Sequence, residues 1–151
     1  MYRFMYENLV EWKNSTHRKP LILEGARQVG KTWLIDEFGP KEFKYYIKIN
    51  CENNPEVSDL FSDYDIKRIL RVISALAKKP VKPGETLIFL DEVQELPKAL
   101  GSLKYFSENA PPPHAKRRIA CLRMWGLRRG AAISHRSFQA VRLSELRLPA
   151  R

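Results

Sequence analysis

The sequence predicts an α/β fold in which a parallel sheet is flanked by helices. Segments with helical spacing alternate with short apolar segments along residues 1–110, an order typical of a parallel sheet. The run Leu87-Ile88-Phe89-Leu90 is apolar throughout, as expected of a strand that is covered on both faces. A second short run, Leu21-Ile22-Leu23, is bounded by proline and glycine and predicts another buried strand.

The other elements follow from apolar spacing and from residues that begin or end helices. Residues 1–18 predict a leading helix, one face of which carries Tyr2, Met5, Leu9 and Trp12. Residues 31–38 predict a helix that Gly39-Pro40 ends. Residues 45–49 are aromatic and β-branched, which favours a strand.

Residues 66–77 give the clearest helical pattern. Asp65 is a good N-cap residue, and Lys78-Lys79 suit the negative end of the helix dipole. The apolar face of this helix carries Ile66, Ile69, Leu70, Ile73, Leu76 and Ala77. Beyond the strand at 87–90, Pro97 opens a further helix.

The 151 residues carry a net charge of +10, which by itself suggests a nucleic-acid partner, but the charge is unevenly distributed along the chain. Residues 1–110 hold 17 Lys and Arg against 16 Asp and Glu, so this part is nearly neutral. Residues 111–151 hold Lys116, nine arginines and one acid, Glu145. We therefore expect a domain over 1–110 and a basic tail over 111–151.

Several classes of protein are excluded by composition. No segment approaches the ~20 apolar residues of a membrane span, and the first residues lack the apolar region of a secretory signal. Cys51 and Cys121 form neither a disulfide framework nor a zinc-binding pattern. The simplest expectation is a cytoplasmic protein without a membrane partner.

The most specific motif is Gly25-Ala26-Arg27-Gln28-Val29-Gly30-Lys31-Thr32, which is the P-loop pattern GxxxxGK[ST]. Glycines let successive backbone N–H groups converge on phosphates, and the helix that follows directs its positive end at the anion. Lys31 would contact the β- and γ-phosphates of ATP, and Thr32 would bind Mg²⁺. The alternative is a glycine-containing turn with an exposed lysine.

Two acids follow the strand at 87–90, and they support the P-loop interpretation. In P-loop NTPases an aspartate at this place holds Mg²⁺, a role that falls to Asp91. Glu92 would orient or deprotonate the attacking water. The alternative is a solvated pair of acids at the end of a strand.

The run from Lys19 to Thr32 resembles the bacterial and archaeal AAA-type ATPases that carry a DUF4143 C-terminal region. The further matches are Leu9-Glu11-Trp12, Tyr46 to Asn50, LIFLDEVQ at 87–94, and Ser102 to Phe106. The resemblance covers about residues 1–110. It implies an ATPase with Glu92 as its catalytic glutamate, ATP and Mg²⁺ as cofactors, and a homo-oligomer in the full-length family. It leaves the protein or nucleic-acid partner undefined.

After Ala110 the sequence departs from this family. The family continues into a strand that ends in Gly-Ser, then into a fifth core strand and the C-terminal region, and no Gly-Ser occurs in 111–151. We expect the sheet to be incomplete beyond 87–90 and the tail to be poorly ordered, with Ile119–Leu122 as the segment that orders if any does. The arginine-rich composition suggests a tail that is partly out of frame.

Three hypotheses about function follow. The chain is an AAA-type ATPase with impaired hydrolysis, a nucleotide-binding remnant without turnover, or a basic protein that binds nucleic acid through its arginines, with Trp125 and Phe138 stacking on bases. For single residues we expect Trp12 and Trp33 to be packing residues rather than stacking platforms, and Cys51 to be buried. We expect Asn50 to form a turn; the alternative is that it approaches the nucleotide site from the end of its strand. For Arg27 the sequence favours neither of two interpretations. The side chain contacts a phosphate or a neighbouring subunit, or it is a solvated charge of the loop.

Overall fold

The computed structural model describes residues 2–15, 18–25, 30–52, 54–108, 120–126 and 139–142. Its helices are α1 (Tyr2–Asn14), α2 (Lys31–Glu42), α3 (Pro55–Leu60), α4 (Ile66–Ala77) and α5 (Pro97–Glu108), with a 3₁₀ turn η1 (Val93–Glu95). Its strands are β1 (Leu21–Gly25), β2 (Tyr45–Asn50), β3 (Thr86–Asp91), β4 (Ala120–Gly126) and β5 (Gln139–Arg142). The predicted α/β class, a parallel sheet flanked by helices, is confirmed.

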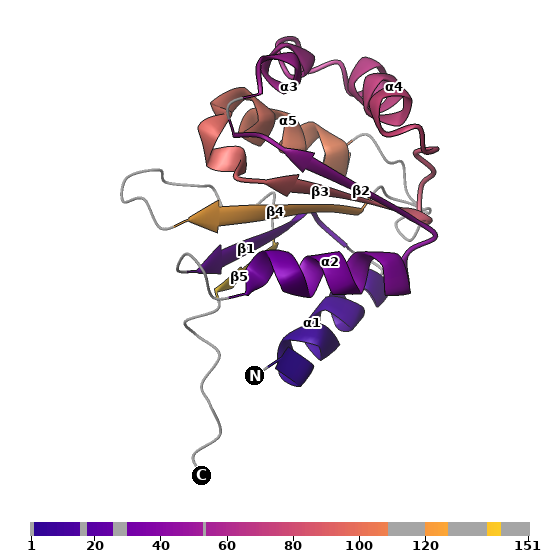
Figure 1. Cartoon of the computed structure of the whole chain (residues 1–151), viewed down its shortest axis with the longest axis vertical. Coiled ribbons are helices and arrows are strands. Elements are labelled where there is room, and N and C mark those ends of the chain that lie inside the picture. Colours follow the sequence, from indigo (N-terminus) through magenta and orange to yellow (C-terminus); the bar gives the residue numbers. More distant parts are fainter. Residues whose placement is uncertain are drawn as a thin grey trace.

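The strands form one sheet in the order β2-β3-β4-β1-β5, and every neighbouring pair is parallel (Figure 1). At the carboxyl ends of the strands, Asn50 of β2 pairs with Asp91 of β3, and Gly25 of β1 pairs with Gly126 of β4. Because parallel strands end on the same side, these residues lie along one edge of the sheet.

The expectation that the sheet stops at residues 87–90 is wrong. β4 lies between β3 and β1, and β5 pairs with the other side of β1. The predicted order over Ile119–Leu122 is confirmed from Ala120 onward, where β4 begins and continues to Gly126, and Ile119 lies outside the described residues. The physical reason is that buried β1 needs hydrogen-bond partners on both sides, and backbone pairing does not require the side-chain pattern that the arginines interrupt.

Helices lie on both sides of the sheet, α1 and α2 on one side and α3, α4 and α5 on the other (Figure 1). In β3, Leu87 and Phe89 pack with α1 and α2, whereas Ile88 and Leu90 pack with α3, α4 and η1. The predicted face of α1 is confirmed at Trp12, which is only 2% exposed. Both faces of β3 are thus dry, and this strand presents a polar side chain to its surroundings only at its carboxyl end, at Asp91.

The predicted end of α2 at Gly39-Pro40 is wrong, because the helix continues to Glu42. Phe38 and Phe43 are buried edge to face, with ring centroids 6.0 Å apart, so packing outweighs the missing proline N–H. A Cβ on Gly39 would lie 2.4 Å from the ring of Tyr46. Gly39 therefore allows β2 to approach the helix closely.

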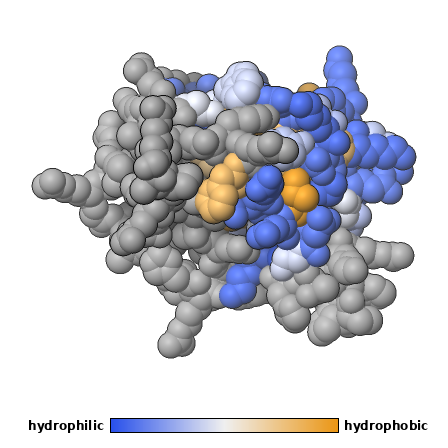
Figure 2. All heavy atoms as spheres, turned by 90° about the horizontal axis from the view of Figure 1, so that it is seen from below, coloured by the Kyte–Doolittle hydropathy of each residue, from blue (hydrophilic) through white to orange (hydrophobic). Residues whose placement is uncertain are grey.

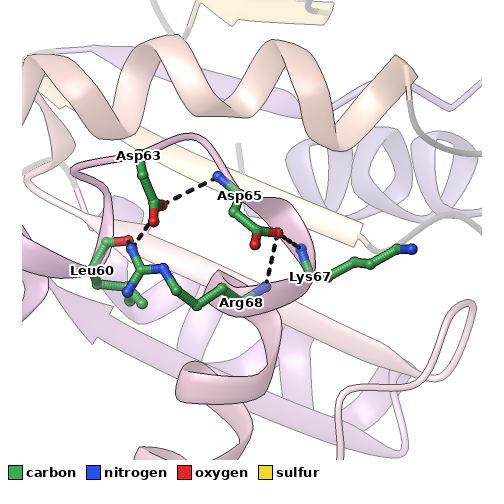
Figure 3. A network of polar contacts seen from close by, with 5 residues as sticks. All are labelled: Leu60, Asp63, Asp65, Lys67 and Arg68. Atoms are coloured by element: carbon green, nitrogen blue, oxygen red, sulfur yellow. Dashed lines mark hydrogen bonds and ion pairs between the residues drawn. The ribbon is translucent and has the colours of Figure 1, made fainter.

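The N-terminus of α4 forms as predicted (Figure 3). The Asp65 carboxylate accepts hydrogen bonds from the backbone N–H groups of Lys67 and Arg68, at 3.0 and 3.2 Å. The Arg68 guanidinium turns back to the Asp63 carboxylate, at 2.7 Å, and to the Leu60 carbonyl, at 2.8 Å. Along the helix Ile66, Ile69 and Ile73 are buried as predicted, whereas Leu76 is exposed.

Two further residues test the sequence-based expectations. Cys51 is buried as predicted, and burial raises its pKa to about 12, so the thiol stays protonated. Trp33 is not a core residue, because it is 60% exposed on α2. The helix α3 was not predicted, although Asn54 as an N-cap and Pro55 at the first position are its signals.

The underside of the molecule is mainly hydrophilic where its side chains are described (Figure 2). The apolar area on that face occurs as small separate spots. Within the described ranges, no helix combines the length and apolar character that crossing a bilayer requires.

Candidate functional site

The site begins where β1 ends and α2 starts. β1 ends at Gly25 and α2 begins at Lys31, so the strand before the motif and the helix after it are confirmed. Gly30, the N-cap residue, has φ 82° and ψ 14°, in the left-handed region that favours glycine. The first turn of α2 then closes from the Leu34 N–H to the Gly30 carbonyl, at 3.0 Å. This geometry places Lys31 and Thr32 at the positive end of the helix.

Lys31 is buried, with 6% of its surface exposed. Burial lowers its pKa, and the negative charges of Glu92 and Asp91 oppose that shift. The lysine of α2 and the acids after β3 thus lie close enough to interact, although 60 positions separate Lys31 from Asp91. This position contradicts the alternative of an exposed loop lysine.

Asp91 is the last residue of β3, and it is partly withdrawn from solvent. Burial raises its pKa above the ordinary value, as do the charges of Glu92 and Asp36, whereas the Lys48 charge and a hydrogen bond from the Glu92 backbone N–H oppose that rise. Its Oδ1 atom is buried and accepts no hydrogen bond in the described part of the chain. A buried carboxylate oxygen without a partner is costly unless a cation or donor satisfies it.

The described residues fit Mg²⁺. Magnesium takes oxygen ligands, keeps several waters, and binds through one or two carboxylates together with the phosphates of a nucleotide. The orphaned Oδ1 of Asp91 is one such ligand, and the Thr32 hydroxyl has the right chemistry to be another. Among the described residues no group of three or more His, Cys, Asp or Glu gathers as an all-protein metal cage.

Glu92 follows Asp91 with its backbone in the left-handed region, at φ 52° and ψ 37°. A non-glycine residue there carries strain, and such strain concentrates at functional sites. The η1 turn continues directly from it, with the Glu95 N–H donating to the Glu92 carbonyl at 3.1 Å. The backbone thus leaves the sheet sharply at Glu92 rather than continuing along the strand direction.

Some predicted site residues lie outside the described residues. Ala26, Arg27, Gln28 and Val29 form the middle of the P-loop motif and belong to this group. Gly25 is described as the end of β1. Asn50 is described, and it forms the predicted turn, since its side chain accepts a hydrogen bond from the Glu52 N–H at 2.9 Å.

Sequence reasoning missed three residues next to Asp91. Lys48 of β2 lies 3.9 Å from the Asp91 carboxylate and 2.8 Å from that of Asp36. The Tyr46 hydroxyl donates to Asp36 at 2.7 Å. Two signals were available in the sequence. Tyr46 and Lys48 lie two residues apart and therefore share one face of β2, and Asp36 follows Thr32 by one helical turn.

Comparison with known families gives a match to the AAA domain over residues 17–118, more than half of the chain. The chain therefore belongs to the AAA domain family. Among solved structures it is similar to PCH-2 from C. elegans, with a TM-score of 0.51 and 14% identity. That likeness covers 87% of this chain and 39% of the PCH-2 chain, so it shows the fold alone, over part of a longer protein. A comparison with curated proteins found no match.

Replacing Asp91 with Asn is expected to raise the free energy of unfolding of the ligand-free protein near neutral pH. The pKa of Asp91 in the folded chain lies above its ordinary value of 3.8, so ionisation costs stability as the pH rises through the folded pKa. Below pH 3.8 the carboxyl group is protonated in both states and the cost disappears. Urea denaturation at several pH values should show a difference that shrinks toward acid.

The exposed Asp59 of α3 supplies the control, because Asp59→Asn removes a carboxylate that burial does not penalise. An Asp91→Asn protein that is less stable than wild type near pH 7, without nucleotide or metal, would contradict the argument.

Proposed function

We propose that this chain binds ATP or ADP together with Mg²⁺ at the carboxyl edge of its sheet, as the nucleotide-binding part of an AAA-type ATPase. The observation that supports the proposal most strongly is the burial of Lys31 close to two acids at the first turn of α2. A lysine is withdrawn from water at a cost, and a phosphate chain would offset that cost. The AAA domain match over residues 17–118 supports the same function.

The proposed roles follow from position. The backbone of Gly25–Gly30 would surround the phosphates, as glycine-rich loops before a helix do. Lys31 would neutralise the β- and γ-phosphates, and Thr32 and Asp91 would hold Mg²⁺, which supplies charge neutralisation when bound. Glu92, at the turn directly after Asp91, would orient the water that attacks the γ-phosphate.

Hydrolysis by this chain is proposed to be weak. The sheet continues beyond β3 through β4 and β5, so the residues at the carboxyl end of β4 bear on hydrolysis. That strand ends in Trp125-Gly126, where the related ATPases carry a polar residue after glycine. An arginine finger is worth about 10³–10⁵ in rate in P-loop enzymes, and the sequence motifs of residues 1–110 assign none.

Four further proposals concern the domain organisation, the family relationship, the assembly and the location of the chain. The division at residue 110, the DUF4143 relationship, a homo-oligomer and a cytoplasmic location rest on the sequence. The chain spans 39% of the solved neighbour, so its partners and mechanical output would belong to a larger protein. Salt-sensitive binding of nucleic acid by residues 111–151 is the second candidate function, and only the charge of that segment favours it.

Replacing Lys31 with Ala is expected to abolish stabilisation by nucleotide. A ligand present at 100 times its dissociation constant stabilises the native state by about 2.7 kcal/mol. Thermal unfolding with and without Mg²⁺-ADP should therefore show a clear upward shift in Tm for wild type and none for the variant. Lys98→Ala, an exposed lysine on α5, is the matched control and should shift as wild type does. Equal shifts in the Lys31 variant and wild type would refute the site.

Steady-state ATP turnover is expected to stay below about 1 s⁻¹, the low end for enzymes. The reason is that positioning of water by Glu92 leaves the charge of the transition state incompletely neutralised. Phosphate release with Mg²⁺-ATP measures the rate, and Glu92→Gln should remove what turnover there is without weakening ADP binding. Turnover above that level would show that this chain completes its own catalytic site.

A further inference from the structure

Beside the proposed magnesium ligand lies a group of four polar side chains, here called the Lys48 cluster: Asp36, Tyr46, Lys48 and Asp91. The Lys48 ammonium lies 2.8 Å from the Asp36 carboxylate and 3.9 Å from the Asp91 carboxylate. The Tyr46 hydroxyl donates to the other oxygen of Asp36, at 2.7 Å. One ammonium is thus shared unequally between two acids, with Asp36 as the closer partner.

Three elements, α2, β2 and β3, supply the residues of the Lys48 cluster. Tyr46 and Lys48 lie two residues apart on the same face of β2, and β2 pairs with β3 in a register that sets Lys48 beside Phe89. The ammonium lies 5.7 Å from the centroid of the Phe89 ring, two positions before Asp91. Asp36 comes from α2, one turn after Thr32. Burial and the bond to Asp36 raise the pKa of Tyr46, so its hydroxyl stays a donor.

The two oxygens of Asp91 have different surroundings. Oδ2 faces the Lys48 ammonium, whereas Oδ1 is buried and accepts no hydrogen bond from the described residues. A carboxylate with one oxygen near a fixed charge has a preferred rotation, and partners of this kind orient metal ligands. The orientation leaves Oδ1 as the oxygen that still needs a cation.

We propose that Lys48 is a positioning residue for magnesium: it holds Oδ2 of Asp91 so that Oδ1 points to the metal, while Asp36 and Tyr46 keep the ammonium from closing on Asp91. The inference rests on the proposed function. Without Asp36 the ammonium would pair fully with Asp91 and compete with Mg²⁺ for it. Without Lys48 the Asp91 carboxylate would lose the fixed charge that orients Oδ2, and Asp36 and Asp91 would repel each other.

The experiment measures how much Mg²⁺ strengthens nucleotide binding. The affinity for the non-hydrolysable ATP analogue AMP-PNP is determined by calorimetry with Mg²⁺ and with EDTA, and the ratio of the two is the Mg²⁺ gain. In Lys48→Met the affinity in EDTA should stay within about twofold of wild type, while the Mg²⁺ gain should fall about tenfold, as when a partner of a metal ligand is lost. Lys48→Arg should keep most of the gain.

Lys44→Met is the matched control. Lys44 has an acid partner, Glu85, at 3.7 Å, but it lies just before β2 at the opposite edge of the sheet from Asp91. Its loss should leave the Mg²⁺ gain unchanged. Asp36→Asn is an independent variant that keeps Lys48. It should lower the Mg²⁺ gain because the Lys48 ammonium then pairs with Asp91 alone. If Lys48→Met does not fold, the Mg²⁺ gain of Asp36→Asn tests the inference.

Two results would overturn the inference while leaving the proposed function in place. One is a wild-type Mg²⁺ gain that survives in both Lys48→Met and Asp36→Asn. The other is a loss of affinity that is equal in Mg²⁺ and EDTA, which would indicate a purely structural role. A wild-type protein that binds no AMP-PNP in either condition would overturn the proposed function and the inference together.

Discussion

The pairing of buried parallel strands is the constraint on which the rest of the structure depends. Both faces of β3 are covered by helices, so its backbone groups find partners only in β2 and β4. That requirement forces all strands to end along one edge, where Asp91 and the start of α2 meet. A polar site therefore arises at the edge of an otherwise apolar sheet, without any need for polar groups inside it.

The charged groups at this edge lower the stability of the ligand-free chain, and their arrangement suits a bound ligand. Lys31 is buried, and the same burial raises the pKa of Asp91 while one of its oxygens has no described hydrogen-bond partner. Each feature costs free energy in the ligand-free chain. Lys48, by contrast, has two acids within 4.0 Å, and it separates them. In the proposed function, phosphates would contact the Lys31 ammonium and Mg²⁺ would bind the Asp91 carboxylate, which would offset these costs.

The sequence was sufficient for most of the fold and for the core of the site, because local signals determined them. The P-loop pattern located Lys31 and Thr32, and the apolar run of β3 located Asp91 and Glu92. The continuation of α2 through Gly39-Pro40 could not be predicted locally, because it depends on the Tyr46 ring packing against Gly39. The strand β5 was not predicted, and β4 was predicted only over Ile119–Leu122, because their place is set by the free edges of β3 and β1 and arginines interrupt their own apolar pattern. The Lys48 cluster likewise joins residues from α2, β2 and β3 that no short motif connects.

A crystal structure of the chain with Mg²⁺ and AMP-PNP tests the central claim most directly. The claim is that the carboxyl edge of the sheet, between α2 and β3, is a magnesium–nucleotide site. The account predicts phosphates at the first turn of α2, the Lys31 ammonium on their oxygens, and the metal between the Thr32 hydroxyl and Oδ1 of Asp91. Nucleotide bound elsewhere, or an Asp91 carboxylate turned away from the metal, would contradict it.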